Sequence, residues 1–86
     1  MSYVYILRCS DGTLYTGWTT CLEKRLQMHN IGKASKYTRG RLPVEIVYWE
    51  QHEKKEDAMK RERQIKGFAR PAKLNLCYPP KTMPAG

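Results

Sequence analysis

The sequence lacks several features that define common protein classes. Its three cysteines, Cys9, Cys21 and Cys77, are odd in number and form no Cys-x-x-Cys pair, which argues against a disulfide scaffold and a zinc knuckle. Free thiols suit a reducing compartment. The apolar run at residues 3–7 is too short for a signal-peptide core or a membrane span. We therefore expect a soluble, cytoplasmic protein with no membrane partner.

Several catalytic signatures are also absent. The sequence contains no Gly-rich phosphate loop, nucleophile elbow, His-Glu-x-x-His motif or cluster with metal-ligand spacing. Acidic residues are scarce, because eight Asp and Glu stand against sixteen Lys and Arg, which gives a formal charge of +8. This excess favours polyanionic partners, with nucleic acid as the leading candidate.

The length of 86 residues indicates one small domain, and no internal repeat is visible. Three of the five prolines lie in the final nine residues, which contain few core-forming side chains. We predict a folded domain over residues 1–77 and a disordered Pro-rich tail over residues 78–86.

Two aromatic-rich runs near the start predict a β-hairpin. Residues 3–9 and 13–18 are mostly β-branched, aromatic or aliphatic, and Ser10-Asp11-Gly12 between them favours a turn. Strand periodicity separates a face with Tyr3, Tyr5 and Leu7 from a face with Val4, Ile6 and Arg8. Tyr5 and Tyr15 would lie within one or two residues of register, so both phenols can face one site. The alternative, that Tyr is only a good strand residue, stays open.

A helix is predicted after the hairpin. Thr20 and Glu23 match a capping box, and residues 30–32 offer a C-terminal stop. Leu22, Leu26 and His29 recur on one side of this helix, and Arg25 is a neighbour of His29. These two polar side chains are candidates for a site, although both could simply reach outward to solvent.

The next segment, residues 32–43, is predicted to be a basic loop because it has glycines, a proline and no acidic residue. Cations with an exposed aromatic suit phosphate contact and stacking on bases or sugars. The alternative is a solvated basic loop. The candidate nucleic-acid-binding residues are Lys33, Lys36, Tyr37, Arg39 and Arg41.

Residues 44–51 predict a third strand, with Val44, Ile46 and Tyr48 on one face. Residues 53–66, which are free of Gly and Pro, predict a helix. Its apolar stripe is formed by Ala58, Met59, Ile65 and Ala69, and Glu62 lies in the middle of it. A carboxylate in that position needs a partner, either in an ion pair, for instance with Arg25, or with a divalent cation.

A last short helix is predicted from Pro71 to about Leu76, with Asn75 as a polar position. The assembled side chains suit phosphodiester hydrolysis. A tyrosinate could activate water, Arg25 could bind the phosphate, and Glu62 could hold one Mg²⁺, which needs few protein ligands. The phenol must first lose its proton to a neighbour or have its pKa lowered.

The order Tyr3-Val4-Tyr5, Tyr15-Thr16-Gly17, then Arg25 with His29, then Glu62 resembles the GIY-YIG nuclease domain, over about residues 3–76. The resemblance is greatest to the small stand-alone bacterial members. This sequence departs from the family's pattern at three positions. Tyr3 replaces a glycine, Thr16 replaces an isoleucine, and Cys21 stands where an acidic residue is common. Tyr3 adds bulk beside Tyr5.

The resemblance implies an α+β fold with a three-stranded antiparallel sheet flanked by helices, in the order β-β-α-β-α-α. It also implies a metal-dependent endonuclease that hydrolyses DNA, in repair or recombination, with one Mg²⁺ or Mn²⁺ ion. Branched or damaged DNA is a candidate substrate, and a protein partner is a candidate source of specificity. The implied residues are Tyr5, Tyr15, Arg25 and His29 as catalytic groups, Glu62 as metal ligand and Asn75 as support. The alternative is a non-catalytic nucleic-acid-binding module on the same scaffold.

Overall fold

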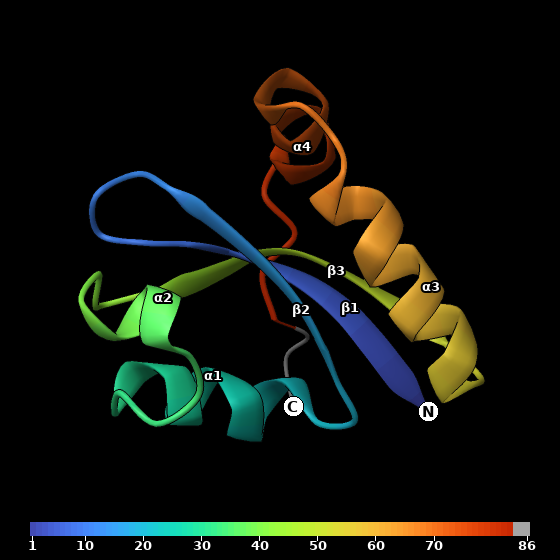
Figure 1. Cartoon of the computed structure of the whole chain (residues 1–86), viewed down its shortest axis with the longest axis horizontal. Coiled ribbons are helices and arrows are strands. Elements are labelled where there is room, and N and C mark those ends of the chain that lie inside the picture. Colours follow the sequence, from blue (N-terminus) through green and yellow to red (C-terminus); the bar gives the residue numbers. More distant parts are fainter. Residues whose placement is uncertain (84–86) are drawn as a thin grey trace.

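The computed structural model describes residues 1–83 and contains a three-stranded antiparallel sheet with helices on both faces (Figure 1). Along the chain the elements are β1 (Ser2–Arg8), β2 (Leu14–Thr19), α1 (Leu22–Asn30), α2 (Lys36–Arg39), β3 (Glu45–His52), α3 (Lys55–Lys66) and α4 (Arg70–Cys77). The strand order is β2-β1-β3. The predicted fold class is confirmed, and the short helix α2 is an addition within the predicted basic loop.

The hairpin of β1 and β2 places the two tyrosines close together. Tyr5 lies opposite Gly17 and Leu7 lies opposite Tyr15, so the tyrosines are diagonal neighbours on one face. The turn is fixed by Asp11, whose Oδ1 accepts hydrogen bonds from the Thr13 amide at 3.1 Å and the Thr13 hydroxyl at 2.6 Å.

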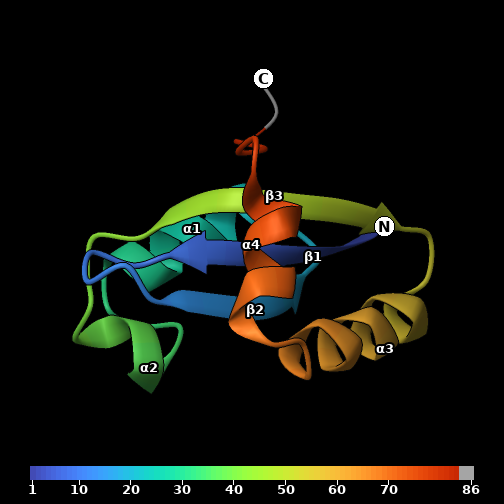
Figure 2. The same cartoon turned by 90° about the horizontal axis from the view of Figure 1, so that it is seen from above.

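Each face of the sheet has its own core, and Figures 1 and 2 show α1 on one side and α3 with α4 on the other. We call these sides the α1 face and the α3 face. The buried cluster of the α1 face consists of Tyr5, Leu7, Cys9, Leu22, Val44 and Ile46. The buried cluster of the α3 face consists of Val4, Ile6, Val47, Ala58, Ile65 and Cys77. The alternation predicted for β1 therefore separates the two cores.

Strand β3 contains a bulge that the sequence pattern did not predict. Ile6 pairs with Tyr48 and Leu7 pairs with Ile46, which leaves Val47 as an extra residue. A bulge shifts the alternation by one position. Val47 and Tyr48 therefore both pack on the α3 face. The prediction that Tyr48 shares a face with Val44 and Ile46 is wrong.

Helix α1 begins where the sequence indicates but without the predicted capping box. Its N-cap is Cys21, which makes no side-chain capping hydrogen bond. The Thr19 hydroxyl accepts the Cys21 amide at 3.1 Å instead. The helix ends before Gly32, whose φ of +78° suits a residue without a Cβ.

The Pro-rich segment was expected to be disordered, but residues 78–83 lie along β3. The Lys81 amide donates to the Val47 carbonyl at 2.8 Å, and the Trp49 indole donates to the Thr82 carbonyl at 2.8 Å. The Lys81 ammonium also lies 4.0 Å from the Trp49 ring centroid. Residues 84–86 of the predicted tail lie outside the described residues. Within residues 1–83, none of the helices is long and apolar enough to cross a membrane.

Candidate active site

A cleft of about 270 Å³ lies along β2, which is an edge strand of the sheet. At an edge, side chains from both faces can reach the same space. Tyr5 and Tyr15 come from the α1 face, and Glu62 comes from helix α3 on the other face. The lining residues are Tyr5, Tyr15, Gly17, Trp18, Thr19, Thr20, Arg25 and Glu62.

Gly17 leaves the space that the Tyr5 ring occupies. A Cβ placed on Gly17 would lie 2.6 Å from the Tyr5 hydroxyl oxygen and 2.8 Å from its Cζ. These distances are well below van der Waals contact, so a larger residue would displace the ring. The glycine of the Tyr15-Thr16-Gly17 tripeptide is therefore required by the close approach of Tyr5 to the backbone of β2.

The Tyr5 phenol belongs to a buried chain of hydrogen bonds. Its oxygen lies 2.8 Å from Nε2 of His29, and Nδ1 of His29 lies 2.8 Å from the Thr38 hydroxyl oxygen. His29 is 1% exposed. The pairing of a buried imidazole with a phenol and a hydroxyl satisfies both ring nitrogens, as burial of a polar ring requires. His29 therefore does not simply reach outward to solvent.

Burial also sets the protonation states of this pair. Burial first, and then the nearby Arg25 charge, lowers the pKa of His29 to about 4. Burial, followed by Tyr15, raises the pKa of Tyr5 above its ordinary value, while Arg25 opposes this shift. Near neutral pH the phenol keeps its proton and the imidazole is uncharged, so the two form a neutral hydrogen bond.

Glu62 is half-buried, as its position in the apolar stripe predicts. The adjacent stripe residues Ala58 and Ile65 are fully buried, and the Glu62 side chain is 17% exposed. Its ion-pair partner within residues 1–83 is Lys66, at 3.7 Å, rather than Arg25. Arg25 is exposed on α1 and lines the same cleft. The cleft thus contains one carboxylate and one guanidinium that make no ion pair with each other.

The basic segment is more ordered than a solvated loop. Tyr37 stacks on Tyr15 with ring centroids 5.9 Å apart, and the Arg41 guanidinium lies 4.1 Å from the Tyr37 centroid. Arg41 also pairs with Asp11 at 3.0 Å. Tyr37 and Arg41 are therefore engaged within the fold. The other three candidates for nucleic-acid contact, Lys33, Lys36 and Arg39, are exposed.

Two other residues that the sequence analysis names, Tyr3 and the candidate Asn75, lie away from the cleft lining. Tyr3, which replaces a glycine of the motif, packs edge-on against Trp49 with centroids 6.1 Å apart. Its bulk is therefore accommodated beside β3 and does not narrow the cleft. Asn75 is exposed on α4, which packs against β3, so the structure does not bring it to the other candidates.

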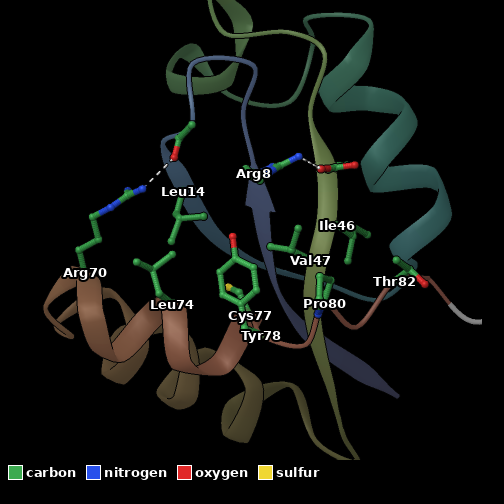
Figure 3. A pocket seen from close by; sticks show the side chains of 12 residues that line it. Arg8, Leu14, Ile46, Val47, Arg70, Leu74, Cys77, Tyr78, Pro80 and Thr82 are labelled. Carbon is green, nitrogen blue, oxygen red and sulfur yellow. Dashed lines mark hydrogen bonds and ion pairs between the residues drawn. The ribbon is translucent and has the colours of Figure 1, made fainter.

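A larger cavity, of about 430 Å³, lies between the hairpin, α4 and residues 78–82 (Figure 3). Its charged groups are already paired. Arg8 binds Glu45 at 2.6 Å, and Arg70 donates to the Gly12 carbonyl at 3.1 Å. Leu14, Leu74 and Cys77 supply an apolar wall. The smaller cleft on β2 is the better candidate for chemistry, because its Arg25 and Glu62 make no ion pair with each other and its Tyr5 phenol is hydrogen-bonded to a buried histidine.

Comparison with family models matches residues 1–75 to the GIY-YIG catalytic domain. The chain belongs to this family. A UPF0213 protein of Clostridium perfringens is 57% identical over 76 residues, covering 88% of this chain and 82% of that protein. The solution NMR structure of the UPF0213 protein BH0048 from Bacillus halodurans is 45% identical with a TM-score of 0.57, covering 88% and 82% of the two chains.

A second solution NMR structure, that of the protein EF2693 from E. faecalis, is 35% identical with a TM-score of 0.59 and covers 100% of this chain and 96% of that one. The names of these relatives state no activity. GIY-YIG domains are generally found in nucleases, and the family assignment carries that general expectation to this chain.

Sequence reasoning missed Thr38, the buried partner of His29. A threonine within a basic segment carries no catalytic signature. The signal that could have directed attention to it is the preceding Ser35, since serine favours a helix N-cap. In the structure the Ser35 side chain accepts the Tyr37 amide and starts α2, the helix that presents Thr38 to His29.

Proposed function

We propose that this protein is a divalent-metal-dependent endonuclease that hydrolyses DNA phosphodiester bonds in the cleft along β2. The observation that carries the proposal is the convergence, at one sheet edge, of Tyr5 with its His29 partner, Arg25 and the half-buried Glu62. Membership of the GIY-YIG family supports the same reaction class. A base, a cation at the phosphate and a metal ligand are the groups that this hydrolysis needs.

Tyr5 and His29 together act as the base. As water attacks phosphorus, a water proton moves to the Tyr5 oxygen and the Tyr5 proton moves to Nε2 of His29, 2.8 Å away. Shared transfer removes the need for a free tyrosinate, which burial disfavours. Tyr15 contacts the His29 ring edge-on, with centroids 5.2 Å apart, and its phenol positions the attacking water.

Arg25 binds the scissile phosphate. It is an exposed guanidinium at the cleft and makes no ion pair among the described residues, so its donors remain free for a phosphate oxygen. A planar guanidinium can donate two parallel hydrogen bonds to phosphate, which fixes orientation as well as charge.

Glu62 would hold the single metal ion, Mg²⁺ or Mn²⁺. The described residues contain no group of three His, Cys, Asp or Glu side chains suited to a metal, but Mg²⁺ retains several waters and needs only one or two carboxylates. Glu62 supplies one, and its loose 3.7 Å contact with Lys66 is readily displaced. When bound, such an ion would neutralise charge on the leaving oxygen.

The basic surface beside the cleft would hold the DNA backbone. Lys33, Lys36 and Arg39 are exposed around α2, and α2 is connected to the cleft through the Tyr37–Tyr15 stack. Phosphate contacts of this kind supply affinity without sequence specificity. The substrate's structure, branched or damaged, and any role in repair or recombination would then depend on features outside this surface, including a partner protein.

The proposal is tested by nicking of supercoiled plasmid and of branched DNA with and without Mg²⁺ or Mn²⁺. The parent should cleave only with metal, and Glu62→Ala and Arg25→Ala should each lower the cleavage rate by about 10²–10³-fold. Glu56→Ala and Lys24→Ala remove exposed residues of the same charge from the same helices and should keep the parent's rate.

Cleavage that survives both cleft substitutions would contradict the proposal. Salt-sensitive DNA binding that is lost on neutralising Lys36 and Arg39, but without metal-dependent cleavage, would identify a non-catalytic binding module.

A further inference from the structure

Thr38 is a buried hydroxyl that the proposed chemistry does not use directly. It lies on α2, it is 0% exposed, and it does not line the cleft. Its Oγ1 lies 2.8 Å from Nδ1 of His29 and 3.3 Å from the Ser35 carbonyl oxygen. A buried hydroxyl with two well-placed partners, one of them the imidazole that contacts Tyr5, calls for an explanation beyond filling space.

The contact between Thr38 and Ser35 indicates the direction of the hydrogen bond to His29. The Ser35 carbonyl can only accept, and the Thr38 hydroxyl donates its single proton to it at 3.3 Å. The same carbonyl accepts the Arg39 amide at 3.1 Å and has a second lone pair for Thr38. The Thr38 oxygen is then left to accept a hydrogen bond, and Nδ1 of His29 must carry the hydrogen.

We infer that Thr38 is a positioning residue that fixes His29 in its Nδ1–H tautomer, so that Nε2 faces Tyr5 as an acceptor. In the opposite tautomer the Nε2 hydrogen would point at the Tyr5 oxygen, and the phenol could not pass its proton to the ring. The bond from Nδ1 of a histidine to a neighbouring group commonly selects which nitrogen reacts. This inference rests on the proposed function, because it assigns His29 as the acceptor of the Tyr5 proton.

Two substitutions separate the hydroxyl from the volume of Thr38. Thr38→Val keeps the shape and removes the hydroxyl, whereas Thr38→Ser keeps the hydroxyl. The imidazole ¹⁵N chemical shifts of His29, measured in the DNA-free protein near neutral pH, report the tautomer. The parent and Thr38→Ser should show the Nδ1–H form. Thr38→Val should shift the population toward the Nε2–H form, because Tyr5 can still accept from that nitrogen.

Single-turnover cleavage provides the second readout. Thr38→Val should be slower than the parent by about 10-fold to 100-fold, the usual effect of losing the group that orients a histidine ligand or base, and Thr38→Ser should recover most of the rate. Thr16→Val is the matched control. It removes another buried hydroxyl, one without a hydrogen-bond partner among the described residues, and it should change neither the tautomer nor the rate.

The inference is overturned if the parent shows the Nε2–H form, a result that does not depend on whether any variant folds. It is also overturned if a folded Thr38→Val retains the Nδ1–H form. A parent that has the Nδ1–H tautomer but does not cleave DNA contradicts the proposed function instead, so the two failures give different results.

Discussion

The two faces of the sheet bury similar numbers of strand residues but fill the space differently. On the α3 face, the fully buried side chains Val4, Ile6, Ala58 and Ile65 are all apolar, and the buried hydroxyl of Thr16, opposite Ile6, has no hydrogen-bond partner among the described residues. On the α1 face, the buried set includes Tyr5, His29 and Thr38, linked by hydrogen bonds. Burying polar groups is costly unless each is paired, and pairing only offsets that cost. Both faces contribute apolar packing, but only the α1 face keeps a buried hydrogen-bonded polar chain, to which the proposal above assigns a role in chemistry.

The α3 face also contains charged groups, but these lie at its edge, whereas the polar groups of the α1 face are buried in its interior. Glu50 accepts from Tyr48 at 2.6 Å and from the Arg61 guanidinium at 3.1 Å, and it pairs with His52 at 2.6 Å. These side chains lie at the partly exposed rim. They join β3 to α3 and lie outside the cleft lining. A polar cluster at a rim is a support for packing, whereas the fully buried chain of His29 leads into the cleft.

The largest expected effect is on the apolar face. Ile65→Ala should lower the free energy of unfolding by about 2–5 kcal/mol, because Ile65 is fully buried against the sheet. Urea denaturation measures this change, with the exposed Lys60→Ala as control. Cleavage per folded molecule should stay near the parent's value. A specific loss of cleavage in folded Ile65→Ala would show instead that the packing of the α3 face is part of the active site.

The next effect is a pH dependence of stability on the polar face. The folded-state pKa of His29 is about 4, against an ordinary value of 6.5. The unfolded chain therefore binds more protons in this window, and the stability from neutral His29 is lost as pH falls from about 6.5 toward 4. The loss should approach about 3 kcal/mol at the acid end. Urea titrations at several pH values should show a steeper decline for the parent than for His29→Gln, and parallel curves would contradict the assignment.

The smallest effect tests the close approach within the cleft. Gly17→Ala places a methyl group against Tyr5, which should cost about 1–3 kcal/mol of stability as overpacking. It should also slow cleavage by roughly 10²-fold, because the phenol is displaced by a fraction of an ångström to about 1 Å. Gly40→Ala is the control, since its Cβ meets nothing within 4 Å. Equal cleavage rates in Gly17→Ala and Gly40→Ala would show that Tyr5 takes no part in the reaction.

Much of the fold follows from local patterns. The hairpin was predicted from strand alternation, and helices α1 and α3 from helix propensity and from their apolar positions. The half-burial of Glu62 was predicted because this carboxylate lies in an apolar stripe. Local patterns failed where tertiary contacts decide the outcome. The bulge at Val47 places Tyr48 on the α3 face. The Thr20 capping box is not formed, since the N-cap is Cys21, whose amide binds Thr19.

The sequence predicted which residues line the cleft but not the hydrogen bonds and stacking contacts that hold them in place. Tyr5, Tyr15, Arg25 and Glu62 meet at the cleft as the motif spacing suggests. The link from His29 to Thr38 could not be predicted, because it depends on how α2 folds back on α1. The stacking of Tyr37 on Tyr15 could not be predicted either, because it is a contact between residues far apart in the sequence. The roles of these residues in catalysis remain the proposal stated above.

The proposed function depends most on Glu62 as the ligand of a divalent metal ion in the cleft along β2. The most direct measurement is a Mn²⁺ titration of the ¹⁵N-labelled protein, followed by paramagnetic broadening of each amide signal. Broadening should begin around Glu62 and at Tyr5 and Tyr15 across the cleft, and Glu62→Gln should abolish it while Glu56→Gln does not. Broadening centred on the exposed acids at the start of α3, or unchanged by Glu62→Gln, would contradict the proposed metal site.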